Sequence, residues 1–198
     1  MTRILSRHDS HLGVLAATCS ILAVIGFGVA LDGYSHVVHP LALLGARGVP
    51  GATAFNLLGF VAPGLLAAAV ALRMRTRLPK QGGWAGGIGA ALLLLSALAF
   101  AAQGLLPLDP HDLDGPVSQW HATCWTLWWI AFLPGAALLA LGLRRSDGWR
   151  GFARLAVVAA VGGLVLTVVS GVLLPGPIAQ RLLLALWWCV IVVASRSR

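Results

Sequence analysis

Residues 84–106 read WAGGIGAALLLLSALAFAAQGLL and contain no charged side chain. A transmembrane α-helix needs about 20 mostly apolar residues, so this stretch is sufficient to cross a bilayer. Similar stretches lie on both sides of it, and together they give six candidate spans, at 12–31, 51–72, 84–106, 117–143, 155–174 and 176–195. None alternates polar and apolar residues as membrane β-barrel strands do. The sequence therefore predicts an all-α fold, a polytopic membrane protein built as a bundle of six transmembrane helices.

The composition of the whole chain agrees with this prediction. Of the 198 residues, 59% are hydrophobic, only 10% are charged, and none is glutamate. Soluble domains carry about 25% charged residues, and disordered chains are poor in apolar residues, so both classes are disfavoured. We expect a single membrane domain over residues 1–198, with membrane lipids and no nucleic acid as partners.

The basic residues indicate how the spans are oriented. The formal net charge is +8, but the positive charges are not spread evenly over the two sides of the predicted bundle. Only Arg47 and Arg181 lie on one side. The other twelve flank the opposite ends of the spans: Arg3, Arg7, Arg73, Arg75, Arg77, Lys80, Arg144, Arg145, Arg150, Arg154, Arg196 and Arg198. The positive-inside rule then predicts that both termini are cytoplasmic.

An arginine, a pair of glycines and two prolines within or beside the spans allow further predictions. Arg181 interrupts the start of the sixth span, and its long side chain is expected to extend to the membrane interface. Gly83 and Gly87 form a small-xxx-small pair suited to close helix packing. Pro63 and Pro134 are expected to bend or locally open their helices, either as ordinary bends or as a functional hinge.

The scarce polar residues gather on the side away from most basic residues. Polar groups near hydrocarbon are expensive and usually face the bundle interior. We therefore expect a polar pocket open to the outer face, with His36, His39, Asp109 and His121 at its centre. Asn56 and Gln103 are expected to orient these groups, and Asp32 and Tyr34 are further candidate binding residues. His111, Asp112 and Asp114 lie in the same predicted loop as Asp109.

Histidine and carboxylate together suggest a metal site or acid–base chemistry. This combination suits zinc, iron or manganese, so His36, His39, Asp109 and His121 are candidate ligands of a divalent metal such as zinc. The spacing matches neither the Glu-x-x-His pattern of di-iron bundles nor HExxH, and a solvated acidic loop is the alternative. His121 and Asp109 are the candidate catalytic residues. Alternatively, His121 is a helix tie hydrogen-bonded to a carboxylate or a backbone carbonyl.

The same residues give weaker support for haem binding or for a disulfide framework. Haem bound between helices needs histidines well inside the spans. His121 lies near the outer end of its span, so haem is disfavoured. Cys19, Cys124 and Cys189 all fall within spans, so they give no disulfide framework. The tryptophans of the fourth and sixth spans are expected to pack ordinarily, or alternatively to line a groove for lipid or substrate.

The order of several motifs resembles that of a known family. His39-Pro40 is followed by Leu44-Gly45 and Phe55-Asn56, and later come Pro107-Leu-Asp109 and His121. This pattern, over about residues 32–139, is similar to the bacterial and archaeal membrane family designated domain of unknown function 998. Family members often carry a serine where this chain has Leu41-Ala42-Leu43. The resemblance implies six helices in a bacterial or archaeal plasma membrane, and it favours His39, Asn56, Asp109 and His121 as site residues. It implies no activity, because the family has none assigned.

Three functions remain open from the sequence. The first is metal-assisted or acid–base chemistry on an outer-leaflet lipid or amphiphile. The second is binding or transport of a small ligand, and the third is a structural or accessory role without catalysis. Whether the chain is an enzyme stays open, and a homo-oligomer is compatible with each function.

Overall fold

The computed structural model describes residues 11–197, and this part of the chain is mainly helical. Six helical stretches are long and apolar enough to cross a membrane, which confirms the predicted six-helix architecture. They are α2 (Leu12–Ala30), the continuous stretch α3 (Ala52–Phe55), η2 (Asn56–Val61) and α4 (Ala62–Arg77), α5 (Gly83–Leu105), α6 (Pro116–Leu143), α7 (Arg150–Val169) and α8 (Gly176–Arg196). Two short 3₁₀ helices, η1 (Leu41–Gly45) and η3 (Lys80–Gly82), lie in the connections.

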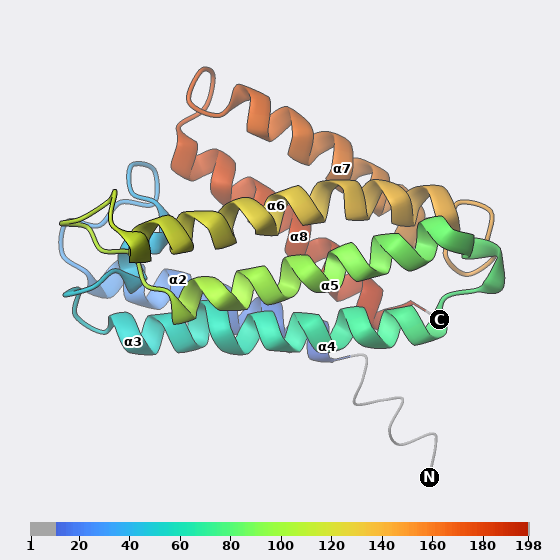
Figure 1. Cartoon of the computed structure of the whole chain (residues 1–198), viewed down its shortest axis with the longest axis horizontal. Helices are drawn as coiled ribbons and strands as arrows, with labels where there is room; N and C mark the ends of the chain where they lie inside the picture. Colours follow the sequence, from blue (N-terminus) through green and yellow to red (C-terminus); the bar gives the residue numbers. More distant parts are fainter. Residues whose placement is uncertain (1–10, 198) are drawn as a thin grey trace, which may run out of the picture.

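Successive spans run in opposite directions, so the connections gather at two ends of the bundle (Figure 1). We call the end with loops 31–51, 106–115 and 170–175 the histidine end, at the left of Figure 1. The arginine end holds loops 78–82 and 144–149, together with the start of α2 and the end of α8. These two helix ends touch, because a Cβ added at Gly13 would lie 2.8 Å from the Ile191 carbonyl oxygen.

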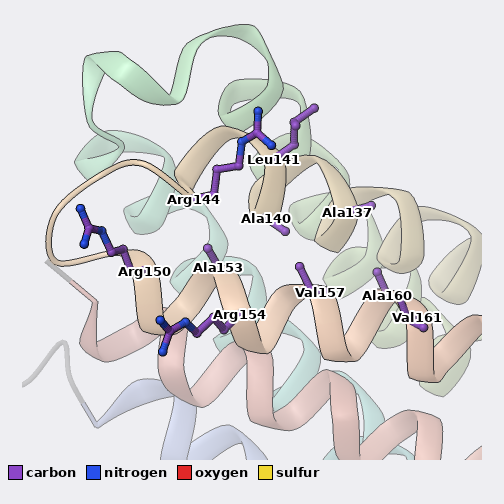
Figure 2. Close-up of a pocket in the computed structure, with 10 residues that line it drawn as sticks. All are labelled: Ala137, Ala140, Leu141, Arg144, Arg150, Ala153, Arg154, Val157, Ala160 and Val161. Atoms are coloured by element: carbon purple, nitrogen blue, oxygen red, sulfur yellow. The ribbon is translucent and has the colours of Figure 1, made fainter.

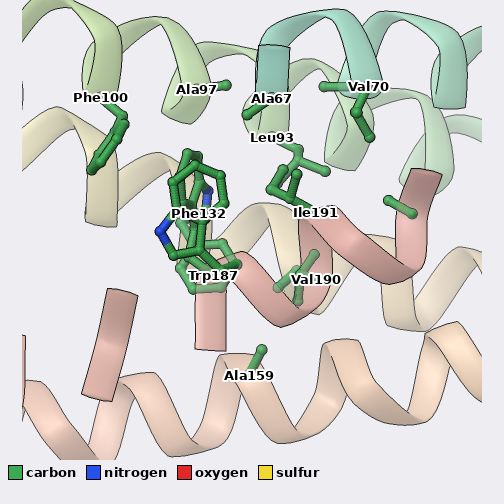
Figure 3. Close-up of a cluster of buried hydrophobic side chains, with 14 of the residues drawn as sticks. Ala67, Val70, Leu93, Ala97, Phe100, Phe132, Ala159, Trp187, Val190 and Ile191 are labelled. Carbon is green, nitrogen blue, oxygen red and sulfur yellow. The ribbon is translucent and has the colours of Figure 1, made fainter. Parts of the chain in front are cut away.

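Aromatic side chains fill the centre of the bundle (Figure 3). Phe100 of α5 packs against Trp187 of α8 with ring centroids 4.8 Å apart, and Trp187 lies 4.4 Å from Trp188. Trp128 of α6 is fully buried against the same group. Lipid tails are as apolar as these side chains, so tight van der Waals packing, not removal from water, holds this centre together. The packing interpretation of these three tryptophans is confirmed.

Glycines allow α5 and α6 to approach each other closely. A Cβ at Gly89 would lie 2.8 Å from the Leu139 backbone nitrogen, and one at Gly142 would lie 2.7 Å from the Gly86 backbone nitrogen. The expected contact through Gly83 and Gly87 is wrong, because neither has any neighbouring atom within 4 Å of such a Cβ. A one-residue step turns a helix by about 100°, so the same glycine spacing shifted along the helix faces another direction.

The second span is opened locally before Pro63, as expected. Residues Asn56–Val61 form a π-helix, and Pro63 has no N–H to donate to the Gly59 carbonyl one turn earlier. The Ser20 hydroxyl of α2 donates to that carbonyl at 2.9 Å, and the Cys19 thiol donates to the Leu58 carbonyl at 3.3 Å. Side chains of a neighbouring helix thus satisfy backbone groups that the irregular turn releases, as the lipid interior requires.

Candidate functional site

Arg181, in the second turn of α8, holds the first loop of the histidine end. Its Nη1 donates to the carbonyl oxygens of His39 at 3.2 Å and Pro177 at 2.9 Å. Its Nη2 donates to the Tyr34 hydroxyl at 2.6 Å and lies 3.3 Å from His36 Nδ1. We call Arg181, Tyr34, His36 and His39 the arginine clamp. The side chain extends onto the first loop, which offers it three acceptors, and the Pro177 carbonyl of α8 is the fourth.

The clamp joins a cation to neutral groups. A guanidinium only donates, so His36 accepts through an unprotonated Nδ1. Burial, and then the charge of Arg181, lower the pKa of His36 below its ordinary value. Burial raises the pKa of Tyr34 and outweighs the opposing effect of Arg181, so this hydroxyl stays neutral. Among residues 11–197, no carboxylate forms an ion pair with Arg181.

His121 joins the start of α6 to the end of α5. Its Nδ1 lies 2.8 Å from the Leu106 carbonyl oxygen and 3.2 Å from that of Gln103. The last carbonyls of a helix lack partners within it, and a carbonyl only accepts, so Nδ1 carries the proton. The side chain is only 6% exposed. These contacts are those of the helix tie that the sequence left open as an alternative.

Asp109 organises the loop between α5 and α6. Its Oδ1 accepts from the His111 backbone N–H at 3.0 Å, and its Oδ2 lies 3.7 Å from Arg47 Nη1. The Arg47 backbone N–H donates to the Leu108 carbonyl at 2.8 Å, which connects this loop to the first one. The Ser118 hydroxyl donates to the Asp112 carbonyl at 2.7 Å and closes the turn onto α6.

The remaining predicted residues also occupy separate positions. Asn56 is buried, and its Nδ2 donates to the Gly45 carbonyl at 2.8 Å. Gln103 is buried as well, and its amide nitrogen has no hydrogen-bond partner among the described residues. Asp32 is exposed, as are three residues of the second loop, His111, Asp112 and Asp114.

The four residues expected at one centre are thus divided by their contacts. His36 and His39 belong to the arginine clamp, Asp109 contacts Arg47, and His121 contacts the end of α5. Within residues 11–197, no three histidine, cysteine or acidic side chains are grouped so that they could hold a metal ion. The metal site therefore stays a prediction that the arrangement of these side chains does not support.

A pocket of about 540 Å³ opens beside the clamp, between α6, α7 and α8. The rings of Trp125 and Trp129 form its wall on α6, and Thr167 of α7 and Ser170, the C-cap of α7, lie opposite α8. On α8 it reaches Gln180, whose Oε1 accepts from the Leu41 backbone N–H at 3.2 Å. Its other lining residues are Pro40, Leu166, Gly176, Pro177, Ala179 and Leu183. We call this the tryptophan pocket.

Neither Gln180 nor Arg181 of α8 was among the site residues predicted from the sequence, where Arg181 was expected only to extend to the membrane interface. A signal for Arg181 was present, because an arginine within an apolar span by default marks a functional or structural polar contact. Gln180 carried no comparable signal, since its importance depends on the first loop folding back over α8.

Comparisons with known proteins give one result. A model of the family described as Protein of unknown function (DUF998) matches residues 15–197. No curated protein and no solved structure matches the chain.

Proposed function

The chain belongs to the family described as Protein of unknown function (DUF998), and from the geometry of the histidine end we propose that it binds an amphiphile from the surrounding leaflet. The observation that carries this proposal is the tryptophan pocket. Its volume of about 540 Å³ falls in the range of about 300–1,000 Å³ that is usual for ligand sites. Because α6 and α7 diverge toward the histidine end (Figure 1), the pocket lies where a lipid could enter sideways.

The lining favours a molecule with an apolar tail and an uncharged polar group. Trp125, Trp129 and Leu183 provide apolar walls, while the side chains of Ser170 and Gln180 provide hydrogen-bonding groups without charge. The Gln180 oxygen is already used by Leu41, which leaves the amide nitrogen as the donor for a ligand. We infer that the headgroup contributes acceptors, such as hydroxyl or ester oxygens.

The orientation of the chain decides which leaflet supplies this ligand. Among residues 11–197, the arginine end carries Asp147 as its only acid against nine lysines and arginines. By the positive-inside rule we propose that this end faces the cytoplasm and that the histidine end faces outward. The ligand then comes from the outer leaflet, and the family resemblance favours the plasma membrane of a bacterium or archaeon.

The arginine clamp supports binding through the position of the first loop. Arg181 fixes His39, and the next residue, Pro40, lines the pocket. Metal-assisted or acid–base chemistry on the bound amphiphile stays a prediction, because Asp109 and His121 are engaged in loop and helix contacts. Incubation of the protein with candidate lipids, followed by mass spectrometry of the products, would reveal such chemistry.

A blocked pocket tests the binding proposal. Thr167→Trp places a large side chain into the pocket, whereas Val168→Trp places the same side chain on a neighbouring surface that is 70% exposed. Native mass spectrometry of the purified proteins would measure the amphiphile that they retain. We expect retention by the wild type and by Val168→Trp, and loss by Thr167→Trp. Equal retention of the same molecules by all three proteins would contradict the proposal.

A further inference from the structure

A second groove lies at the arginine end, between α6 and α7 (Figure 2). It has a volume of about 460 Å³ and is independent of the tryptophan pocket. Its lining residues are Ala137, Ala140, Leu141 and Arg144 of α6 with its C-cap, and Arg150, Ala153, Arg154, Val157, Ala160 and Val161 of α7. Figure 2 shows the three arginines around one end of the groove, with Leu141 near Arg144, and alanine and valine side chains along the rest.

The groove is built from two facing helical stripes. On α7, Arg150, Arg154, Val157 and Val161 recur at the spacing of one helix face, since residues three or four apart lie above one another. On α6 the corresponding stripe runs from Ala137 through Leu141 to the C-cap, Arg144. Both stripes are apolar toward the middle of the membrane and cationic at the end, so the groove itself is amphipathic along its length.

The arginines are exposed and only partly compensated by acids. Arg144, Arg150 and Arg154 are all exposed. Arg150 Nη2 lies 3.1 Å from Asp147 Oδ1, with both side chains largely in solvent, and such a surface pair is weak. Among residues 11–197, neither Arg144 nor Arg154 forms an ion pair with a carboxylate. The end of the groove therefore offers guanidinium groups suited to an anion, and guanidinium binds phosphate with bidentate geometry.

We propose that this groove binds an anionic phospholipid, with an acyl chain between α6 and α7 and the phosphate among Arg144, Arg150 and Arg154. Charge complementarity selects this occupant, because basic pockets between transmembrane helices accommodate anionic headgroups. The lining of this groove includes three arginines, whereas the lining of the tryptophan pocket carries no charge. The inference does not depend on the proposed function of the histidine end.

A second copy of the chain fits the groove less well. The described part of the arginine end presents Arg73, Arg75, Arg77, Lys80, Arg144, Arg145, Arg150, Arg154 and Arg196. Its only acid within residues 11–197 is Asp147. Two parallel copies would therefore bring like charges together at the same depth, and like charges repel.

Native mass spectrometry with two lipid probes tests the proposal. The purified protein is titrated with phosphatidylglycerol and with phosphatidylcholine of the same acyl chains. We expect preferential binding of phosphatidylglycerol, and Arg150→Gln/Arg154→Gln should weaken that binding about tenfold. Arg75→Gln/Arg145→Gln removes the same charge from the same end outside the groove, so it should retain the preference.

A matched pair of apolar variants tests the groove itself. Val157 lines the groove, whereas Val158 does not, and they are 50% and 58% exposed. Val157→Trp should remove the phosphatidylglycerol adduct, and Val158→Trp should keep it, which also controls for folding. Thr167→Trp, which blocks the other pocket, should leave this adduct unchanged. The proposal is overturned if the two lipids bind equally, if the two arginine double variants behave alike, or if Val157→Trp abolishes a protein dimer while lipid binding persists.

Discussion

The Arg181 guanidinium and the Tyr34 hydroxyl are 2.6 Å apart, although 147 residues separate them in the chain. This hydrogen bond connects the last transmembrane helix to the loop that follows the first one. Arg181 is therefore one of the residues that hold the loops of the histidine end in place. The same arginine binds the His39 carbonyl, so a single side chain restrains the first part of the loop, from Tyr34 to His39.

Loss of this arginine should destabilise the protein. Arg181→Met removes hydrogen bonds from a charged donor, and we expect a cost of about 2–3 kcal/mol in the free energy of unfolding. Arg47→Met is the control, because Arg47 is half-exposed and lies 3.7 Å from its partner Asp109, so its loss should cost less than about 1 kcal/mol. Denaturant unfolding in detergent, followed by circular dichroism, measures both. Equal effects would show that the clamp does not stabilise the loop.

The clamp should weaken in acid through His36. Its pKa is lowered by burial and by Arg181 from the ordinary value of 6.5, so the unfolded chain binds a proton more readily than the folded one. The stability contributed by neutral His36 is therefore complete above about pH 6.5 and is lost as the pH falls through the lower folded pKa. We expect the melting temperature of the wild type to decrease over this range, and His36→Gln to flatten the decrease. An unchanged pH profile in His36→Gln would contradict this assignment.

Asn56 and Gly45 form a pair that a double mutant can test. A Cβ at Gly45 would overlap Asn56 Oδ1, so Gly45→Ala should destabilise the protein by about 1–3 kcal/mol. Asn56→Ala leaves the Gly45 carbonyl without its donor and should cost about 1–3 kcal/mol. The double variant should cost less than the sum, because Asn56→Ala removes the overlap. If the changes in unfolding free energy of the two single variants add up to that of the double variant, the two residues do not interact.

Two glycines of α5 should respond in opposite directions to alanine. Gly89→Ala places a methyl group 2.8 Å from the Leu139 backbone nitrogen, and we expect a loss of about 1–3 kcal/mol from overpacking. Gly87→Ala meets nothing within 4 Å, so the higher helix propensity of alanine should stabilise it by up to about 1 kcal/mol. Thermal unfolding of both variants measures this difference. If Gly87→Ala were destabilised and Gly89→Ala were not, Gly87 and not Gly89 would make the contact between α5 and α6.

The six-helix architecture was predictable because it depends on local properties of the chain. A span is defined by the length and hydropathy of a single stretch, and Pro63 acts on the turn that precedes it. The candidate site was less predictable. Sequence position placed His36, His39, Asp109 and His121 near one end of the bundle, but depth in the membrane says nothing about which side chains face each other.

The sequence by itself determined the six spans, the gathering of most basic residues at one end and of most aspartates at the other, and the membership of the family. Only the tertiary structure decided that His121 ties α5 to α6, that Gly89 rather than Gly87 makes the helix contact, and that Arg181 holds the first loop. Each of these depends on the rotation of one helix about its axis relative to another. That rotation is set by the packing of all six helices together, and no short stretch of the chain encodes it.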